Sequence, residues 1–391
     1  MNDTVQRYYF DHNATTPVSA EVLQAMLPCL SEVYGNASSI HYFGQQAKDR
    51  LETARRQVAA LLNADPRDIV FTSGGTEGDN LALLGTVRPC AGKHVITTAI
   101  EHPAVLNASA QIEREGGAVT YTRVGSSGIV DPGDIRRALR PGTVLISVMH
   151  ANNELGTIQP VAEVSRIARE AGVRFHCDGV QAVGRIPTDV RALGVDLYTI
   201  SGHKIHGPKG VGALYVRKDT PLASIFYGGH HERDRRPGTE NVAGAAALGC
   251  AAEWMAQHRE AESPRLERLR DRLEGEILER VPHVHVNGDR RPRLPNTTNL
   301  RFDYIEGESM VIALDLRGFA VSSGAACSSG AVEPSHVLLA IGLTPSQARS
   351  SVRFSLGRSN DEAQVRALIE AVGEAAAHLR KVSAETPAHV G

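Results

Sequence analysis

The motif Ser201-Gly202-His203-Lys204 places a primary amine among small and polar neighbours. It directly follows residues 196–200, a mostly apolar run typical of a β-strand. Because open α/β sheets bind ligands beyond the carboxyl ends of their strands, Lys204 is expected at a binding site. A lysine in such a place contacts a phosphate or, where its amine is partly desolvated, attacks a carbonyl carbon. The alternative is an ordinary solvated lysine at the end of a strand.

A carboxylate, Asp178, ends another predicted strand at 173–178. Its apolar neighbours Phe175 and Cys177 predict partial burial, and a buried carboxylate requires a cationic partner. A protonated pyridine nitrogen is one such partner, and its protonation makes the ring an electron sink. An N-cap or a structural ion pair is the alternative role for this residue.

The glycine-rich segment 72–80 follows the strand predicted at 69–72 and opens a helix. Its glycines allow backbone N–H groups to approach a phosphate, the helix N-terminus favours negative charge, and Thr76 adds a hydroxyl. Neither a Walker motif nor a dinucleotide-binding fingerprint is present. A phosphate cradle, a carboxylate and a strand-end lysine together match what pyridoxal 5'-phosphate (PLP) requires of a protein.

These residues need a sheet that brings strand ends together. Apolar runs typical of strands alternate with helical patterns, which implies a mostly parallel sheet covered on both faces. The helical patterns lie near 80–84, 104–115 and 161–171, the last with Gly172 just beyond its end. The predicted strands are 69–72, 94–98, 143–149, 173–178, 196–200 and 212–216.

The pattern changes after about Ala252 and predicts a smaller α+β domain. Ser263-Pro264 is expected to begin a helix, with Ser263 as N-cap. We place the large PLP-binding domain at 15–257. The small domain comprises 1–14 and 258–391 and carries Cys327. Its predicted elements are a helical face of Leu266, Leu269, Leu273 and Ile277, strands at 299–302 and 352–356, and a final helix at 362–380.

Composition places the chain among globular proteins: its 391 residues are 42% hydrophobic and 22% charged. The net charge of −2 gives no reason to expect nucleic-acid or membrane attraction. No apolar run is long enough to span a membrane, and residues 1–4 show no secretory signal. Five scattered cysteines favour reduced thiols in the cytoplasm. Without CxxC or HExxH, no resident metal is expected.

Motifs along nearly the whole chain resemble those of the cysteine desulfurases of the nitrogenase and iron–sulfur-cluster type. These are class V aminotransferase-like, fold-type I PLP enzymes. The resemblance implies a mostly parallel seven-stranded sheet between helices, plus a smaller α+β domain. The matching segments are 9–17, 34–39, 101–102, 150–156, 178–181, 201–204, 236–241, 322–327 and 352–358.

The resemblance also implies roles for individual residues. Lys204 links to the cofactor and moves protons at the substrate Cα, Asp178 pairs with the pyridine nitrogen, and Gln181 binds the ring oxygen. His102 stacks on the ring and takes part in proton transfer. The phosphate is held by Gly75, Thr76, Ser201 and His203, and by Thr239 of a neighbouring subunit in a homodimer; the substrate carboxylate is received by Asn153 and Arg353.

Taken singly, these residues have simpler readings. His102 precedes Pro103 and suits a helix start, whereas Asn153 and Gln181 suit turns. Arg353 lies in a predicted strand, where it would pair with a buried acid. The combination of all the motifs favours the catalytic roles.

Cys327 determines the reaction. It lies in a segment of small residues, 322–330, which suits a mobile loop with reactive groups, although most thiols are buried and inert. In the family that the chain resembles, this cysteine is the nucleophile. It takes sulfur from L-cysteine as a persulfide and leaves L-alanine. The sulfur then passes to an acceptor such as an iron–sulfur scaffold, and Cys327 contacts a nascent cluster only transiently.

Three alternatives remain open. A selenocysteine lyase or related PLP lyase shares most of these motifs, and an aminotransferase would not need Cys327. A non-catalytic adaptor predicts loss of Lys204 or of the glycine-rich segment, and both are present. The long segment 328–346 favours desulfurases with a long loop. Ala325 stands where many relatives carry Ser, and glycines at 75 and 78 replace bulkier residues.

Overall fold

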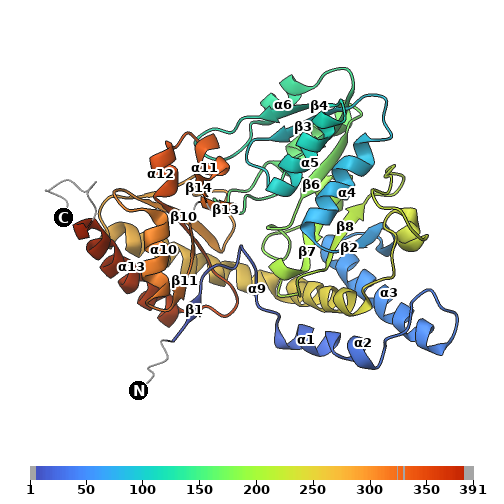
Figure 1. Cartoon of the computed structure of the whole chain (residues 1–391), viewed down its shortest axis with the longest axis horizontal. Helices are drawn as coiled ribbons and strands as arrows, with labels where there is room; N and C mark the ends of the chain where they lie inside the picture. The colour runs from blue at the N-terminus through green and yellow to red at the C-terminus, as the bar shows by residue number, and fades with distance from the viewer. Residues whose placement is uncertain (1–5, 324, 329–330, 383–391) are drawn as a thin grey trace.

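The structure is a computed structural model that describes residues 6–323, 325–328 and 331–382 (Figure 1). Two parts lie side by side, a larger one around a seven-stranded sheet and a smaller one around a four-stranded sheet. The long helix α9 (Val242–Arg280) extends from one part to the other. This architecture confirms the predicted α/β fold with a smaller α+β unit.

The large sheet is mostly parallel, as predicted. Only β8 runs antiparallel to its two neighbours, β2 and β7, so β2 and β7 point in the same direction. The strand order is β2 (Ile69–Thr72), β8 (Gly212–Val216), β7 (Leu197–Ser201), β6 (Arg174–Asp178), β5 (Thr143–Ser147), β3 (His94–Thr98) and β4 (Ala118–Thr122).

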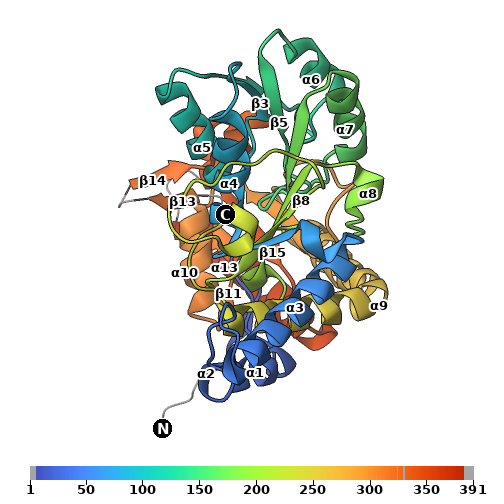
Figure 2. The same cartoon turned by 90° about the vertical axis from the view of Figure 1, so that its right-hand side faces the viewer.

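Helices cover both faces of this sheet, because residues in each strand alternate between two apolar cores. Val70, Leu145 and Leu214 pack with α4 and α5, whereas Phe71 and Ile146 pack with α3, α7 and α9. Figure 2 shows α4 and α5 on one side of the sheet and α7 and α8 on the other. The bounds are α3 (Tyr42–Leu62), α4 (Gly75–Val87), α5 (Pro103–Arg114), α7 (Val161–Glu170) and α8 (Val190–Leu193).

The register of the strands brings the segments with the predicted site residues to one edge of the large sheet. Thr72 at the end of β2 and Ser201 at the end of β7 both lie opposite Gly212 of β8. Asp178, the last residue of β6, lies opposite Thr199 of β7. The glycine-rich segment, Asp178 and the Lys204 motif therefore leave the sheet at the same carboxyl edge, as the sequence predicted.

The smaller sheet is antiparallel and buries its apolar face against α9, α10 (Gly307–Asp315) and α13 (Glu362–Val382). At the chain start, β1 (Tyr8–Tyr9) pairs with β11 (Phe319–Ala320). Strands β13 (Ala325–Ser328) and β14 (Ala331–Pro334) pair antiparallel as a hairpin. The strand order of the sheet is β12 (Ser322–Ser323), β15 (Ser351–Ser355), β10 (Thr297–Phe302) and β9 (Val284–Val286).

The remaining elements are short. They connect the strands or cover the ends of the two parts. The α-helices are α1 (Ala20–Met26), α2 (Pro28–Ser31), α6 (Pro132–Ala138), α11 (His336–Ala340) and α12 (Pro345–Arg349); the 3-10 helices are η1 (Pro66–Asp68), η2 (Gly202–Lys204) and η3 (His231–Asp234).

The predicted helix start at Ser263-Pro264 is wrong, because both residues lie inside α9. The Ser263 hydroxyl donates to the backbone oxygen of Arg185 at 2.6 Å instead of capping a helix. Tertiary packing explains the continuous helix: residues before Pro264 pack in the large core and residues after it pack in the small one. The predicted domain boundary at 257/258 also falls inside this helix.

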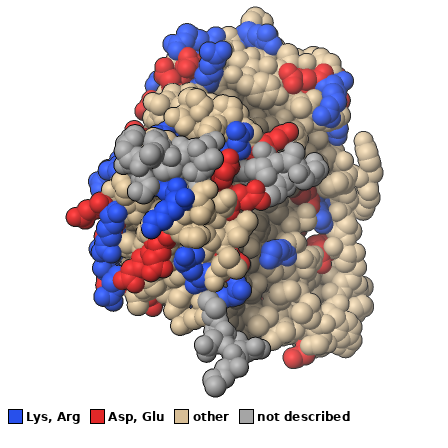
Figure 3. Space-filling model, turned by 60° about the vertical axis from the view of Figure 1, so that its left-hand side comes forward, with Lys and Arg blue, Asp and Glu red and all other residues tan. Residues whose placement is uncertain are grey.

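Charges of both signs are spread over the face shown in Figure 3. Lys and Arg lie among Asp and Glu there, as expected for a net charge of −2. Within the described residues, no helix combines the length and the apolar character that crossing a membrane requires.

Candidate active site

A cavity of about 420 Å³ lies at the carboxyl edge of the large sheet, and Arg353 of the small part closes one side. All the residues predicted to bind the cofactor or the substrate line it, except Thr239. Predicted and present are Gly75, Thr76, His102, Asn153, Asp178, Gln181, Ser201, His203, Lys204 and Arg353; the other lining residues are Asn13, Ala14, Asp79, Met149, Ala151 and Val180.

Lys204 ends the turn η2 that follows β7, and its amine lies in a largely desolvated place. Nζ donates to the backbone oxygens of Asn13 at 2.5 Å and Ala14 at 2.8 Å. Burial, together with Arg185 and Arg353, lowers the pKa of this amine to about 7. A substantial neutral fraction near pH 7 suits an amine that must react with an aldehyde.

Asp178 is a buried carboxylate that faces the cavity, with 6% of its surface exposed. Oδ1 accepts from the backbone N–H of Val180 at 2.9 Å. No Lys or Arg forms a salt bridge with Asp178 among the described residues. Burial raises the pKa of this carboxyl, while His102, the Val180 N–H and Lys204 lower it. A pyridine nitrogen with a proton is the kind of partner this carboxylate lacks.

Asp79 lies beside Asp178 and was not predicted as a site residue. It is 1% exposed, and its Oδ1 has no hydrogen-bond partner but lies 3.5 Å from Nε2 of His176. Burial and the charge of Asp178 raise its pKa well above the ordinary value. Asp79 is therefore harder to ionise than a solvated carboxyl, unlike a carboxylate that balances a cation. The sequence signal that could have identified Asp79 was its position in the glycine-rich segment 72–80.

The start of α4 forms a cradle suited to a phosphate. Gly74, the N-cap, has a φ of +154°, which favours glycine, and a Cβ on Gly75 would lie 2.9 Å from Val180. Ser201 contributes a buried hydroxyl without a partner, and Thr76 lines the same cavity. Free backbone N–H groups, a positive helix end and an unpaired hydroxyl fit the phosphate of PLP.

His102 caps a helix and also lines the cavity. Its Nδ1 accepts from the backbone N–H of Ala104 at 3.1 Å, so the residue caps α5. The ring also lines the cavity, and desolvation lowers its pKa. A neutral ring fixed by its Nδ1 contact suits stacking on a cofactor.

Gln181 is held on both sides of its amide. Nε2 donates to the backbone oxygen of Asn13 at 3.0 Å, and Oε1 accepts from the Arg185 guanidinium at 2.5 Å. Arg185 is buried, and desolvation lowers the pKa of its guanidinium to about 10. Neither Asn13 nor Arg185 was predicted, although Asn13 belongs to the motif at 9–17 that carries the resemblance.

Arg353 on β15 is placed to meet a substrate carboxylate. It donates to Asp11 Oδ1 at 2.7 Å and to the Asn153 backbone oxygen at 3.1 Å. Its Nε is buried without a partner. The simpler role expected from the sequence, an ion pair between Arg353 and an acid, is therefore also present. A bound carboxylate would share this guanidinium with Asp11.

Thr239 is not brought into this cavity by its own chain, and for Cys327 the structure describes only the backbone. Thr239 is exposed and lies in the segment 228–241, away from the lining residues of its own chain. The backbone of Cys327 lies in β13, opposite Val332 of β14, so the predicted loop is a hairpin there. The side chain of Cys327 is outside the part that the structure describes.

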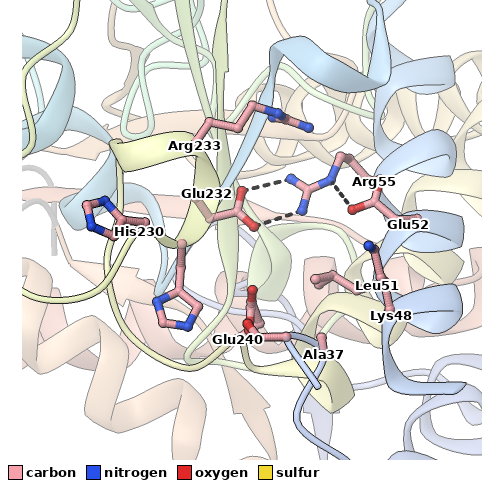
Figure 4. Close-up of a pocket in the computed structure, with 11 residues that line it drawn as sticks. Ala37, Lys48, Leu51, Glu52, Arg55, His230, Glu232, Arg233 and Glu240 are labelled. Carbon is pink, nitrogen blue, oxygen red and sulfur yellow. Dashed lines mark hydrogen bonds and ion pairs between the residues drawn. The ribbon is translucent and has the colours of Figure 1, made fainter. Parts of the chain in front are cut away.

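The segment 228–241 is fixed by buried ion pairs around a second cavity of about 440 Å³ (Figure 4). Glu232 receives two hydrogen bonds from Arg55 of α3, at 2.7 and 2.8 Å. Arg236 donates to Glu77 of the phosphate cradle at 2.8 Å. Thr239 is thus carried outward by a braced segment.

Comparison with known proteins agrees with this geometry. A model of the family "Aminotransferase class-V" matches residues 8–368. A cysteine desulfurase of Nostoc sp. (strain PCC 7120) is 50% identical over 96% of this chain and 94% of its own length. A cysteine desulfurase IscS of Dictyoglomus turgidum is 46% identical, with 96% of both chains covered.

Solved structures show the same relationship. A NifS-like protein superposes with a TM-score of 0.90 at 35% identity, over 95% of this chain and 100% of that one. A NifS-like protein from Rickettsia africae gives a TM-score of 0.86 at 34% identity, over 95% and 99% of the two chains. The chain belongs to the aminotransferase class-V family and, within that family, to the PLP-dependent cysteine desulfurases.

Proposed function

We propose that this enzyme releases L-alanine from L-cysteine and leaves the sulfur as a persulfide on Cys327. The observation that carries the proposal is the shared cavity of Lys204, Asp178 and Arg353. It offers a reactive amine, a carboxylate for a protonated ring and a guanidinium for the substrate carboxylate. An aminotransferase would use the same three groups but has no need of Cys327.

When bound, PLP supplies an electron sink beside the substrate Cα. Lys204 holds the cofactor and moves the proton at Cα, because its pKa of about 7 lets the amine take up or give a proton. Asp178 keeps the ring nitrogen protonated, Gln181 binds the ring oxygen, and His102 stacks on the ring. Asn153 and Arg353 orient the substrate by its carboxylate.

The cradle residues Gly75, Thr76, Ser201 and His203 bind the phosphate. Desolvation and the charge of Lys204 lower the pKa of His203 to about 4, so its ring contributes hydrogen bonding and no positive charge near pH 7. The negative phosphate is instead balanced by the N-terminus of α4.

Sulfur transfer conserves atoms and electrons. The Cys327 thiolate attacks the substrate sulfur, so an S–S bond forms and the C–S bond breaks. The bonding electron pair stays on Cβ, which is protonated to the methyl group of alanine. L-cysteine and one thiol thus give L-alanine and one persulfide without an external oxidant. The persulfide sulfur then passes to an acceptor protein, such as an iron–sulfur scaffold.

The enzyme acts as a homodimer in the cytoplasm. Large apolar side chains are exposed in the two segments that border the second cavity, and such exposure is typical of a subunit interface. Thr239, carried outward on one of these segments, reaches the phosphate of the other subunit. Unpaired cysteines at 29, 90, 177 and 250 suit a reducing compartment. The exposed side chains are Tyr34, Ile40, Tyr42, Phe43, Phe226 and Tyr227.

A single turnover with L-cysteine tests the proposed sulfur route. The wild type gives one alanine and a persulfide on the Cys327 peptide, detected by mass spectrometry. Cys327→Ala gives neither, whereas Cys90→Ser, which alters another partly exposed thiol, behaves as the wild type. Alanine formation by Cys327→Ala at the wild-type rate would show that another group receives the sulfur.

A further inference from the structure

Two contacts hold the end of the Cys327 hairpin against the active site. Ser335, the residue after β14, donates from its hydroxyl to Glu154 Oε2 at 2.5 Å. His336, the next residue, donates from Nε2 to the backbone oxygen of Glu101 at 2.9 Å. Glu154 follows Asn153, and Glu101 precedes His102, so each contact reaches a neighbour of a proposed site residue.

The two loops that receive these contacts form one rigid unit. Asn152 accepts from the backbone N–H groups of Glu154 and Leu155, both at 2.9 Å, and donates to the oxygen of Ile100 at 3.0 Å. Oε1 of Glu101 accepts from the backbone N–H of Met149 at 3.0 Å. A shift of Ser335 is therefore resisted by the same network that holds Asn153 and His102.

The other end of the hairpin is also fixed at the active site. In β12, Ser322 pairs with Arg353 and Ser323 pairs with Val352. Cys327 is four residues beyond Ser323, and four extended residues span at most about 14 Å. The positions of Ser323 and Ser335 therefore limit the positions that Cys327 can reach.

Ser335 combines two functions in one hydroxyl. It accepts from the backbone N–H groups of Val337 and Leu338, at 3.1 and 3.3 Å, and so caps α11. The hydroxyl of Ser335 therefore donates its proton to the hydrogen bond with Glu154. Ser335 is 3% exposed, so water competes little with this contact. A helix cap alone would not require a carboxylate partner in a substrate-binding loop.

We infer that Glu154 and Ser335 are positioning residues for sulfur transfer, which set the place from which the hairpin presents Cys327 to the substrate sulfur. The inference rests on the proposed role of Cys327. Both residues act through the hairpin and touch neither the substrate nor the cofactor. Their loss slows persulfide formation and leaves capture of L-cysteine unchanged.

The test separates these two steps in the PLP-loaded enzyme. Stopped-flow absorbance follows capture of L-cysteine, and quenched samples give persulfide on the Cys327 peptide by mass spectrometry. Ser335→Ala and Glu154→Ala are expected to capture L-cysteine at the wild-type rate but to form persulfide about 10-fold more slowly or worse, as for a hydrogen bond whose loss leaves a buried polar group without a partner. The double variant is no slower than either single one, because both remove the same contact.

Matched variants control for folding. Thr344→Ala removes the cap of α12 in the same region, where the Thr344 hydroxyl contacts Gln347 instead of an active-site loop. It is expected to form persulfide at the wild-type rate. Ser335→Thr keeps a hydroxyl and restores the rate to within about 2-fold of the wild type.

Equal persulfide rates for Ser335→Ala and Thr344→Ala would overturn the inference, and so would a Ser335→Ala enzyme in which capture and transfer slow together. A wild type that forms no persulfide on Cys327 would overturn the proposed function and, with it, this inference. The outcome for the wild type thus distinguishes the two failures.

Discussion

Asp178 and Asp79 are neighbouring buried carboxyl groups with different partners. Asp178 lines the cavity and is the carboxylate that we propose pairs with the ring nitrogen, whereas burial and the charge of Asp178 raise the pKa of Asp79 well above the ordinary value and so favour its neutral form. Asp178→Asn is expected to weaken PLP binding by about 1.5–3 kcal/mol, which is roughly 10- to 150-fold. Because the raised pKa of Asp79 favours its neutral form, Asp79→Asn is expected to keep near wild-type affinity.

Titration of each apoenzyme variant with PLP, followed by absorbance, measures this difference. Equal losses in the two variants would show that Asp79 also carries charge. Sequence reasoning found Asp178 because it ends an apolar strand. It missed Asp79, since a carboxylate near the start of a helix is usually solvated and only the packing of α4 against β6 and β7 buries this one.

The lowered pKa of Lys204 predicts how cofactor capture depends on pH. The amine must be neutral to attack the PLP aldehyde, and its pKa lies at about 7, below the ordinary value of 10.5. As pH rises through about 7 the protonated fraction falls. The rate at which apoenzyme binds PLP is therefore expected to increase about tenfold per pH unit below this pKa and to level off above it.

Stopped-flow absorbance at PLP concentrations below saturation records this profile. Lys209→Ala removes a nearby exposed amine and leaves the midpoint unchanged. A rate that still rises steeply above pH 9 would mean that the Lys204 amine keeps an ordinary pKa. The place of Lys204 was predictable from its strand, but this pKa was not. It depends first on burial of the amine in the folded site and then on Arg185 and Arg353, which reach the site from distant parts of the sequence.

At the scale of elements, strands that are buried on both faces were predictable and exposed ones were not. Residues 118–122 form the edge strand β4, whose pattern Ala-Val-Thr-Tyr-Thr is only partly buried and lacks a continuous apolar run. Tertiary packing also overrode local preference in α9, which continues through Pro264. The hairpin β13–β14 was expected to be a loop, because small residues carry little strand signal.

The ion pair between Arg55 of α3 and Glu232 is expected to contribute strongly to stability. Both side chains are nearly fully buried, and Glu232 also accepts from the backbone N–H of Phe71 at 3.0 Å. Arg55→Ala leaves a buried charge without a partner and is expected to lower the free energy of unfolding by about 3–5 kcal/mol. Urea unfolding of the apoenzyme, followed by fluorescence of the single tryptophan, Trp254, measures this loss.

A substitution of a more exposed partner of Arg55 serves as the control for this loss in the free energy of unfolding. Glu52 also contacts Arg55, but 39% of its side chain is exposed, so Glu52→Ala is expected to cost less than about 1 kcal/mol. The double variant Arg55→Met/Glu232→Leu removes both charges and is expected to be more stable than Arg55→Ala. If Arg55→Ala unfolds at the same urea concentration as Glu52→Ala, the pair does not brace the segment 228–241.

The whole molecule is expected to be a dimer through the surface that exposes Tyr227, whose side chain is 99% exposed in the single chain. The wild type should have twice the 41.9 kDa mass of the chain, and Tyr227→Glu should shift towards the monomer, because a buried charge disfavours the interface. Light scattering after gel filtration gives the mass. Leu316→Glu, at a residue 73% exposed beside α10, remains dimeric.

Mixed dimers test whether Thr239 serves the opposite site. If it does, a hybrid of a Lys204→Ala chain with a Thr239→Ala chain contains one intact site, built from Lys204 of the second chain and Thr239 of the first. That site binds PLP with wild-type affinity, although dimers of either variant alone do not. If Thr239 serves its own chain, both sites of the hybrid are defective and affinity is not restored. Exposure of Thr239 on a braced segment favours the first outcome.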